Sequence, residues 1–370
     1  MTKRNMSSAL LGFFFLFYSA MSLSLSVTDR IQLPSDEDNT QQSYQMPRSL
    51  ILDDNLLVFY KGNQGKIYYN YATYDTLQDE LLWNGNNIKL LAYEKDKPTD
   101  IVTQLWPEPA IINNRIYLFR KNDNDIVRHV YVNNFSELTQ NYWTKNDATI
   151  YEHLRENLTL LTIPSDDPNY GSEMLIAGLQ KREEVFASVS QRIEKQHLYF
   201  NQDKNAHFEK GKAIEVLSTR NVSYYTIAEP PALLFEDTPG DKKVHYFIPR
   251  EDGKTWHYQL TGENYNIRTM VSLLHTNSAV TPAALWHNED LYLLFAQQNG
   301  QIAYMIRTKI VNDLGDVSYS WSEMLALEDL SGNNVVAKTN YGISAVNLGD
   351  SIYLSYADST TRDVTLLKLK

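Results

Sequence analysis

Hydrophobic and polar residues alternate along most of this chain, in a unit that occurs six times. In each unit a short apolar strand meets a polar turn, and a strand of alternating large residues follows, as in Ile116 to Phe119. Alternation with a period of two, bounded by Asn, Asp and Gly, is typical of β-strands. The pattern therefore predicts a succession of antiparallel hairpins.

Each unit adds a third and a fourth strand. Turns such as Gly62–Gly65 precede the third strand, and their Asn and Gly residues accept the positive φ that a tight turn needs. An aromatic residue stands near the start of the fourth strand in four units: Trp83, Trp143, Phe208 and Trp321. Four short antiparallel strands, repeated radially, are the sequence form of a β-propeller blade.

We therefore predict an all-β fold, a six-bladed β-propeller of four-stranded antiparallel blades. An open sandwich of many strands and rings of five or seven blades are the alternatives. The blades are expected at about residues 48–91, 108–150, 171–217, 229–274, 281–327, and 341–370 plus 25–33.

The last unit supplies only three strands before the chain ends at Lys370. The segment from Ser24 is similar to the fourth-strand segment that starts at Tyr319. An N-terminal strand that completes the last blade would close the ring and remove exposed sheet edges. Residues 25–370 are thus expected to form one propeller domain.

The N-terminus has the pattern of a secretory signal peptide, predicted at residues 1–24. Two basic residues, Lys3 and Arg4, precede an apolar run and a series of small residues. The run is too short for a comfortable transmembrane span, so we expect a secreted, extracellular protein without stable membrane insertion. An uncleaved signal anchor is the alternative.

Charge and composition narrow the expected partners. The formal net charge is −11 and no cluster of Lys and Arg stands out, which disfavours nucleic acid as a partner. The chain has no Cys, and its eight His lack the spacing of metal ligands, so neither a metal nor a cofactor is expected. Three sequons would carry glycans in a eukaryotic secretory pathway: Asn134, Asn157 and Asn221.

One local segment, Pro249–Leu260, resembles the Asp-box hairpin of sialidases and related propellers. Gly253, Thr255 and Trp256 match the pattern S-x-D-x-G-x-T-W, and Glu251 stands at the Asp position. The resemblance implies a structural turn within a propeller blade and no catalytic role. An ordinary hairpin turn is the alternative.

The form of the repeat resembles the six-bladed fucose-binding lectins of fungi and bacteria over about residues 24–370. In that family an Arg that leads the second strand and a Glu on the third strand bind the sugar, and an aromatic ring stacks on it. Arg115 matches the Arg position in one unit, but no third strand offers the expected Glu. The resemblance implies carbohydrate binding with few sites.

Five residues are therefore candidate sugar ligands. Aromatic faces stack on the apolar C–H groups of sugar rings, and Arg donates hydrogen bonds to hydroxyl groups. The same Trp rings would alternatively fill the space between blades. The candidates are Trp83, Arg115, Trp143, Trp286 and Trp321.

The main functional hypothesis is a non-catalytic, lectin-like protein with glycans or glycoproteins as partners. A glycoside hydrolase, sialidase-like or otherwise, is an alternative that needs carboxylates converging in the central funnel. The first strands, which should line that funnel, offer few acids: Asp53, Glu108, Glu173 and Glu236. A propeller used only as a protein-interaction surface is the third possibility.

Overall fold

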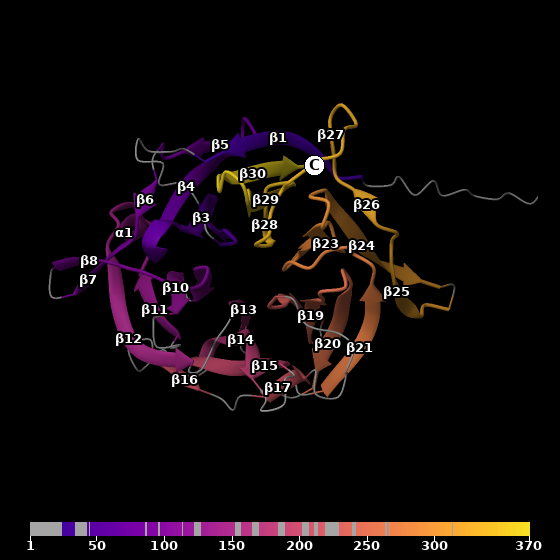
Figure 1. Ribbon diagram of the computed structural model, residues 1–370, viewed down its shortest axis with the longest axis horizontal. Coiled ribbons are helices and arrows are strands. Elements are labelled where there is room, and N and C mark those ends of the chain that lie inside the picture. Colours follow the sequence, from indigo (N-terminus) through magenta and orange to yellow (C-terminus); the bar gives the residue numbers. More distant parts are fainter. Residues whose placement is uncertain are drawn as a thin grey trace, which may run out of the picture.

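The chain folds into six mainly antiparallel sheets arranged around a common centre (Figure 1), as seen in a computed structural model. The fold is an all-β propeller, as the repeat predicts. The structure describes residues 24–33, 43, 45–85, 87–94, 97–112, 114–121, 127–151, 157–164, 170–183, 189–201, 207–210, 214–218, 229–238, 242–262, 265, 267–312 and 314–370. The predicted signal peptide before Ser24 and the sequon at Asn221 lie outside these residues.

Three sheets come from the first half of the chain. The first holds β2 (Arg48–Leu52), β3 (Asn55–Lys61), β4 (Ile67–Asp75) and β5 (Glu80–Trp83), with β6 (Ile88–Lys89) beside β4. The second runs β9 (Glu108–Ile112), β10 (Arg115–Lys121), β11 (Val127–Val132), β12 (Trp143–Tyr151), β7 (Leu91–Glu94) and β8 (Lys97–Asp100). The third holds β13 (Leu158–Pro164), β14 (Tyr170–Glu183), β15 (Val189–Asn201) and β16 (His207–Lys210), with β17 (Ile214–Ser218) beside β15.

The second half supplies the other three. One sheet holds β18 (Ala232–Glu236), β19 (Lys243–Pro249), β20 (Thr255–Thr261) and β21 (Ile267–Leu274). The next holds β22 (Ala283–His287), β23 (Asp290–Ala296), β24 (Ile302–Val311) and β25 (Val317–Trp321), with β26 (Leu325–Ala326) beside β24. The last runs β28 (Ile343–Leu348), β29 (Ser351–Ala357), β30 (Val364–Leu369), β1 (Ser26–Gln32) and β27 (Glu328–Asp329).

The first strand of each sheet is innermost, and each inner strand contacts the inner strands of two neighbouring sheets. β2 contacts β28 and β9, β13 contacts β9 and β18, and β22 contacts β18 and β28. The inner strands therefore surround a central channel. In the third sheet the inner strand is β13, which precedes the blade predicted at residues 171–217, and the segment predicted as its first strand lies in β14.

The two ends of the described chain lie side by side. β1 pairs antiparallel with β30, with Val27 opposite Leu369 and Gln32 opposite Thr365. Figure 1 shows the indigo β1 along the yellow β30. The N-terminal strand thus belongs to the same sheet as the last three strands of the chain.

The hydrophobic core lies between neighbouring sheets, because each alternating strand presents an apolar face to the next sheet. One cluster joins Phe59 and Tyr69 of the first sheet to Leu118, Val130 and Trp143 of the second. All five side chains have no exposed surface. Burying an aliphatic or aromatic side chain contributes roughly 1.5 to 3 kcal/mol, so these contacts between sheets hold the ring together.

Besides β13, two features differ from the expectations. The segment between the first two predicted blades, after residue 91 and before residue 108, was not predicted to contain strands. β7 and β8 nevertheless pair antiparallel there, and β7 extends the second sheet beside β12. A short helix, α1 (Phe135–Thr139), lies between β11 and β12. Asn134 caps this helix by accepting a hydrogen bond from the Glu137 amide at 3.0 Å, so capping stabilises a helix too short to show periodicity.

Candidate functional site

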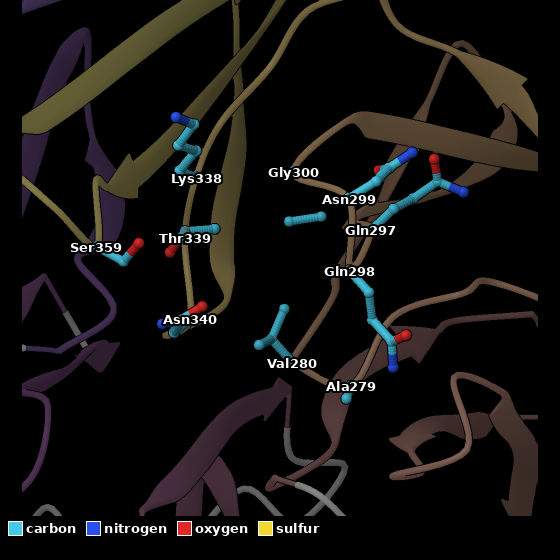
Figure 2. Close-up of a pocket in the computed structure, with 11 residues that line it drawn as sticks. Ala279, Val280, Gln297, Gln298, Asn299, Gly300, Lys338, Thr339, Asn340 and Ser359 are labelled. Carbon is cyan, nitrogen blue, oxygen red and sulfur yellow. The ribbon is translucent and has the colours of Figure 1, made fainter.

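A cavity of about 460 Å³ opens where the sheet of β22–β25 meets the sheet of β28–β30 (Figure 2). One wall is the turn Gln297–Gly300 between β23 and β24. The opposite wall is the connection Lys338–Asn340, together with Ser359 from the turn between β29 and β30. Val280 lies between the two walls and gives the cavity an apolar part. The volume falls in the range of small-molecule sites.

Backbone hydrogen bonds fix both walls of this cavity. The Gly300 amide donates to the Gln297 carbonyl at 2.8 Å, and the positive φ of 85° at Gly300 lets the turn close. The Ala337 amide donates to the Gly300 carbonyl at 2.7 Å, which ties the two walls together. The Ser359 amide donates to the Lys338 carbonyl at 2.6 Å. The cavity is therefore formed before any ligand enters.

Four polar side chains at the cavity make no hydrogen bond with the described part of the chain: Gln298, Lys338, Asn340 and Ser359. Amide and hydroxyl groups each donate and accept, and the ammonium group only donates. Among the described residues, none that lines the cavity is a carboxylate. The arrangement suits a small molecule with several hydroxyl groups.

A row of hydrogen-bonded polar side chains crosses the sheet of β18–β21, with one residue from each strand. Glu236 Oε2 lies 2.7 Å from His245 Nε2, and His245 Nδ1 lies 2.8 Å from His257 Nε2. Ser272 Oγ lies 3.4 Å from His257 Nδ1. Both imidazole rings have no exposed surface, and Glu236 is 6% exposed. We call these four residues the Glu–His row.

The hydrogen bonds of the Glu–His row have one direction. The ionised Glu236 only accepts, so His245 donates through Nε2 and accepts through Nδ1. His257 then donates through Nε2, which leaves its Nδ1 to accept from Ser272. Burial lowers the pKa of His245 and lowers that of His257 well below its usual value. Both rings are therefore neutral near pH 7.

The neighbouring sheet covers the row with two of the candidate tryptophans. Trp286 lies edge-on to His245 with ring centroids 6.1 Å apart, and its Nε1 donates to the Phe235 carbonyl at 2.8 Å. Trp321 lies edge-on to His257 at 5.5 Å. Both tryptophans are half-buried between the two sheets. Each presents only part of its ring to solvent.

The other three candidates lie on different sheets from these two. Trp83 is half-buried at the end of β5, and Arg115 is half-buried at the start of β10, 5.9 Å from the centre of the Tyr131 ring. Trp143 has no exposed surface. Trp143 therefore has no free face for a sugar, and its role as a ligand residue is corrected to that of a core residue. The five candidates do not converge on one site.

The sequons also differ in their surroundings. Asn134 is exposed at the start of α1. Asn157 is 8% exposed, its Oδ1 accepts from the Trp106 amide at 3.3 Å, and its Nδ2 donates to Gln45 at 3.4 Å. A buried, hydrogen-bonded amide leaves no room for a glycan, so the expected modification at Asn157 is corrected.

One acid of the inner strands, Glu108, is buried near the channel. Its Oε1 accepts from Arg48 at 2.6 Å and from the Leu160 amide at 3.1 Å. Burial raises the pKa of Glu108 to about 7, although Arg48 opposes this effect. The adjoining cavity in the channel has a volume of about 160 Å³, and none of the described residues that line it is a carboxylate.

The segment that resembles an Asp-box forms the turn between β19 and β20. The Arg250 amide donates to the Lys254 carbonyl at 2.8 Å, and Gly253 has a φ of 79°. Asp252, and not Glu251, accepts from the Lys254 amide, at 3.3 Å. Trp256 is 5% exposed and packs in the core between sheets. The acid at the turn is thus one position later than the sequence pattern requires.

The described residues were also searched for metal sites and for membrane-spanning helices. Within the described residues, no three His, Asp or Glu side chains gather as metal ligands would. The described part of the chain also has no helix long and apolar enough to cross a membrane.

Comparisons with known proteins place the fold. No protein-family model matches the chain, and no curated protein matches its sequence. A mutant of the Aleuria aurantia lectin in complex with Fucα1-6GlcNAc is similar in structure, with a TM-score of 0.54 and 10% identity over 87% of this chain and 91% of that chain. AofleA from Arthrobotrys oligospora gives 0.51 and 7% identity, over 94% of this chain and 86% of that one.

A mutant Trypanosoma rangeli sialidase displaying trans-sialidase activity is also similar, with a TM-score of 0.50 and 10% identity. It matches 93% of this chain and 59% of the sialidase chain. At these identities the likeness establishes the propeller fold and leaves the ligand open.

Proposed function

We propose that this protein is a lectin-like propeller that binds the sugar units of glycans in the cavity between the β22–β25 and β28–β30 sheets. The observation that carries the proposal is the set of four uncommitted polar side chains around a preformed cavity. The absence of any carboxylate from its lining favours binding without hydrolysis. Because similar folds include the Aleuria aurantia lectin, carbohydrate is the ligand class that we test first.

The proposal includes three finer points. Each of the six sheets is one blade, and β1 closes the ring by joining the sheet of the last three strands. The turn after β19 is a degenerate relative of the Asp-box. The mature protein begins after a signal peptide and acts outside the cell.

Alanine in place of Gln298 or Asn340 is expected to weaken glycan binding. Each variant removes one hydrogen bond between neutral groups, which is worth about 1 kcal/mol, so Kd should rise about 3- to 10-fold. A glycan array would identify the ligand, and calorimetry with that glycan would give Kd for each variant. Gln78→Ala is the matched control, because Gln78 is exposed in the turn between β4 and β5, outside the cavity.

The same measurements separate this site from the positions that the sequence suggested. If the cavity variants bind normally while Trp286→Ala or Arg115→Ala loses binding, the sugar site lies at those residues and not in the cavity. If the folded protein binds no glycan on the array, the lectin-like function is wrong.

A further inference from the structure

The cavity of about 160 Å³ in the central channel is lined by inner strands from five of the six sheets. Its lining is mostly small or apolar side chains, with three hydroxyl groups: Ser49, Thr159 and Ser344. Arg48 is the one charged residue of this lining. The cavity is large enough for a small ion with a few water molecules but is smaller than typical ligand sites.

The Arg48 guanidinium donates one hydrogen bond to a side chain of the described residues. It carries five N–H donors. One nitrogen, Nη2, donates to Glu108, whereas Nε is buried without a partner among the described residues. The Arg48 side chain is 20% exposed, so most of its charge is removed from water. Because Nε has no exposed surface, an anion in the cavity would interact with the net positive charge of the guanidinium and not with this N–H group.

Glu108 is the counter-charge of Arg48 in this structure, but burial disfavours the ionised form of Glu108. The side chain is 1% exposed, and its second oxygen, Oε2, is buried without a partner among the described residues. Burial therefore raises the pKa of Glu108 to about 7, and Arg48 is the one charged group that acts against this shift. Below about pH 7 Glu108 becomes neutral, and Arg48 then has no counter-charge.

We propose that the channel cavity is a binding site for a small monovalent anion, such as chloride or formate, which pairs with Arg48 when Glu108 takes up a proton. One proton enters with one anion, so the net charge of the buried group stays the same. The site is separate from the glycan cavity, since the two share no lining residue. The inference therefore does not depend on the proposed function.

The first test is crystallographic and uses bromide, whose anomalous signal identifies it. Crystals of the full chain soaked in bromide at about pH 5.5 are expected to show an anomalous peak in the channel beside Arg48. Crystals at about pH 8.5 should show a weak peak or none, because the ionised Glu108 competes for Arg48. Absence of the peak at the lower pH would overturn the proposal.

The second test uses thermal unfolding in solution. Chloride should replace methanesulfonate at constant ionic strength, so that general salt effects cancel. At about pH 5.5 a tenfold excess of chloride over its Kd should raise the unfolding midpoint by about 2 °C, and at about pH 8.5 the effect should vanish. A bromide peak without this shift means binding at crystal concentration only, which also counts against the site.

Two variants isolate the residues. Glu108→Gln resembles the protonated acid, keeps an acceptor for Arg48, and is expected to respond to chloride at both pH values. Arg48→Gln should lose the response at both. A Glu108→Gln protein with the same pH-dependent response as the unmodified chain would contradict the role of Glu108. If Arg48→Gln does not fold, the bromide peak and Glu108→Gln still decide the question.

Discussion

Trp143→Ala is expected to lower the free energy of unfolding by about 3 to 5 kcal/mol, the usual cost of removing a large buried aromatic side chain. Trp143 has no exposed surface. Its ring lies edge-on to Phe59, with centroids 6.1 Å apart, and to Tyr69 at 6.0 Å. Both partners belong to the neighbouring sheet, so the variant leaves a cavity between two sheets of the ring.

Urea unfolding, followed by circular dichroism, would measure this loss. Trp143→Phe is the conservative partner variant, because it keeps a ring in the same place and should recover much of the stability. Trp83→Ala is the positional control, since Trp83 occupies a comparable place in the repeat but is only half-buried. Its loss should be smaller, because less of the ring leaves water on folding.

The same experiment separates the two interpretations of the repeated tryptophans. If Trp143 is a core residue, its substitution lowers stability, and the molecules that remain folded bind glycan with unchanged affinity. If Trp143→Ala unfolds like the unmodified protein but no longer binds glycan, the ring faces a ligand, and its assignment to the core is wrong.

The propeller fold could be predicted because it rests on local patterns. The alternation from Ile116 to Phe119 lies within β10, and Asn299 with Gly300 marks the turn before β24. The capped helix α1 and the β7–β8 hairpin were missed, because each depends on a few contacts and not on a repeated pattern. Asn134 and Glu137 form the helix cap, which a search for Asn followed three residues later by Glu would have found.

The glycan cavity could not be predicted in this way. Its walls come from a turn at 297–300, a connection at 338–340 and a third segment at Ser359. These segments have no common periodicity, and they meet only because neighbouring sheets stand side by side in the ring. The sequence analysis instead selected large aromatic residues as sugar ligands. For Trp143, the large apolar ring that suggested sugar stacking is also the reason why the residue is buried in the core.

The Glu–His row was also missed, although the sequence holds a signal for it. The spacings of the eight histidines match no metal-ligand motif, which draws attention away from them. His245 and His257, however, lie on two strands joined by the turn at 250–254, and the register places Phe247 opposite His257. His245 is therefore a diagonal neighbour of His257 on the same face, a distance within reach of aromatic side chains.

The second large effect is a loss of stability in mild acid that depends on this row. The histidine pKa values are lowered in the folded protein from the ordinary value of 6.5, mainly by burial. As the pH falls below about 6.5, the unfolded chain takes up protons that the folded chain excludes. The free energy of unfolding should then decrease by up to about 1.4 kcal/mol per pH unit for each histidine, until the folded pKa is reached.

Several charged groups lie near the Glu–His row, and each affects how stability depends on pH. The positive charge of Arg307 on β24 disfavours a charge on either imidazole ring, and Lys243 on β19 disfavours a charge on His245. Glu236 stays ionised, because its hydrogen bond with His245 keeps its pKa low despite burial. Glu108 has the opposite sign, since its raised pKa makes the folded state gain stability as the pH falls below about 7.

A variant comparison isolates the histidines from Glu108. His257→Gln keeps a donor for His245 Nδ1 but cannot titrate in this range, so its stability should fall less steeply between about pH 6.5 and 5 than that of the unmodified protein. The difference in slope should approach 1.4 kcal/mol per pH unit, a large effect for a single residue. Urea unfolding at several pH values measures both slopes. Equal slopes would mean that His257 takes up a proton within the fold, and the row would then accept a buried imidazolium beside Arg307.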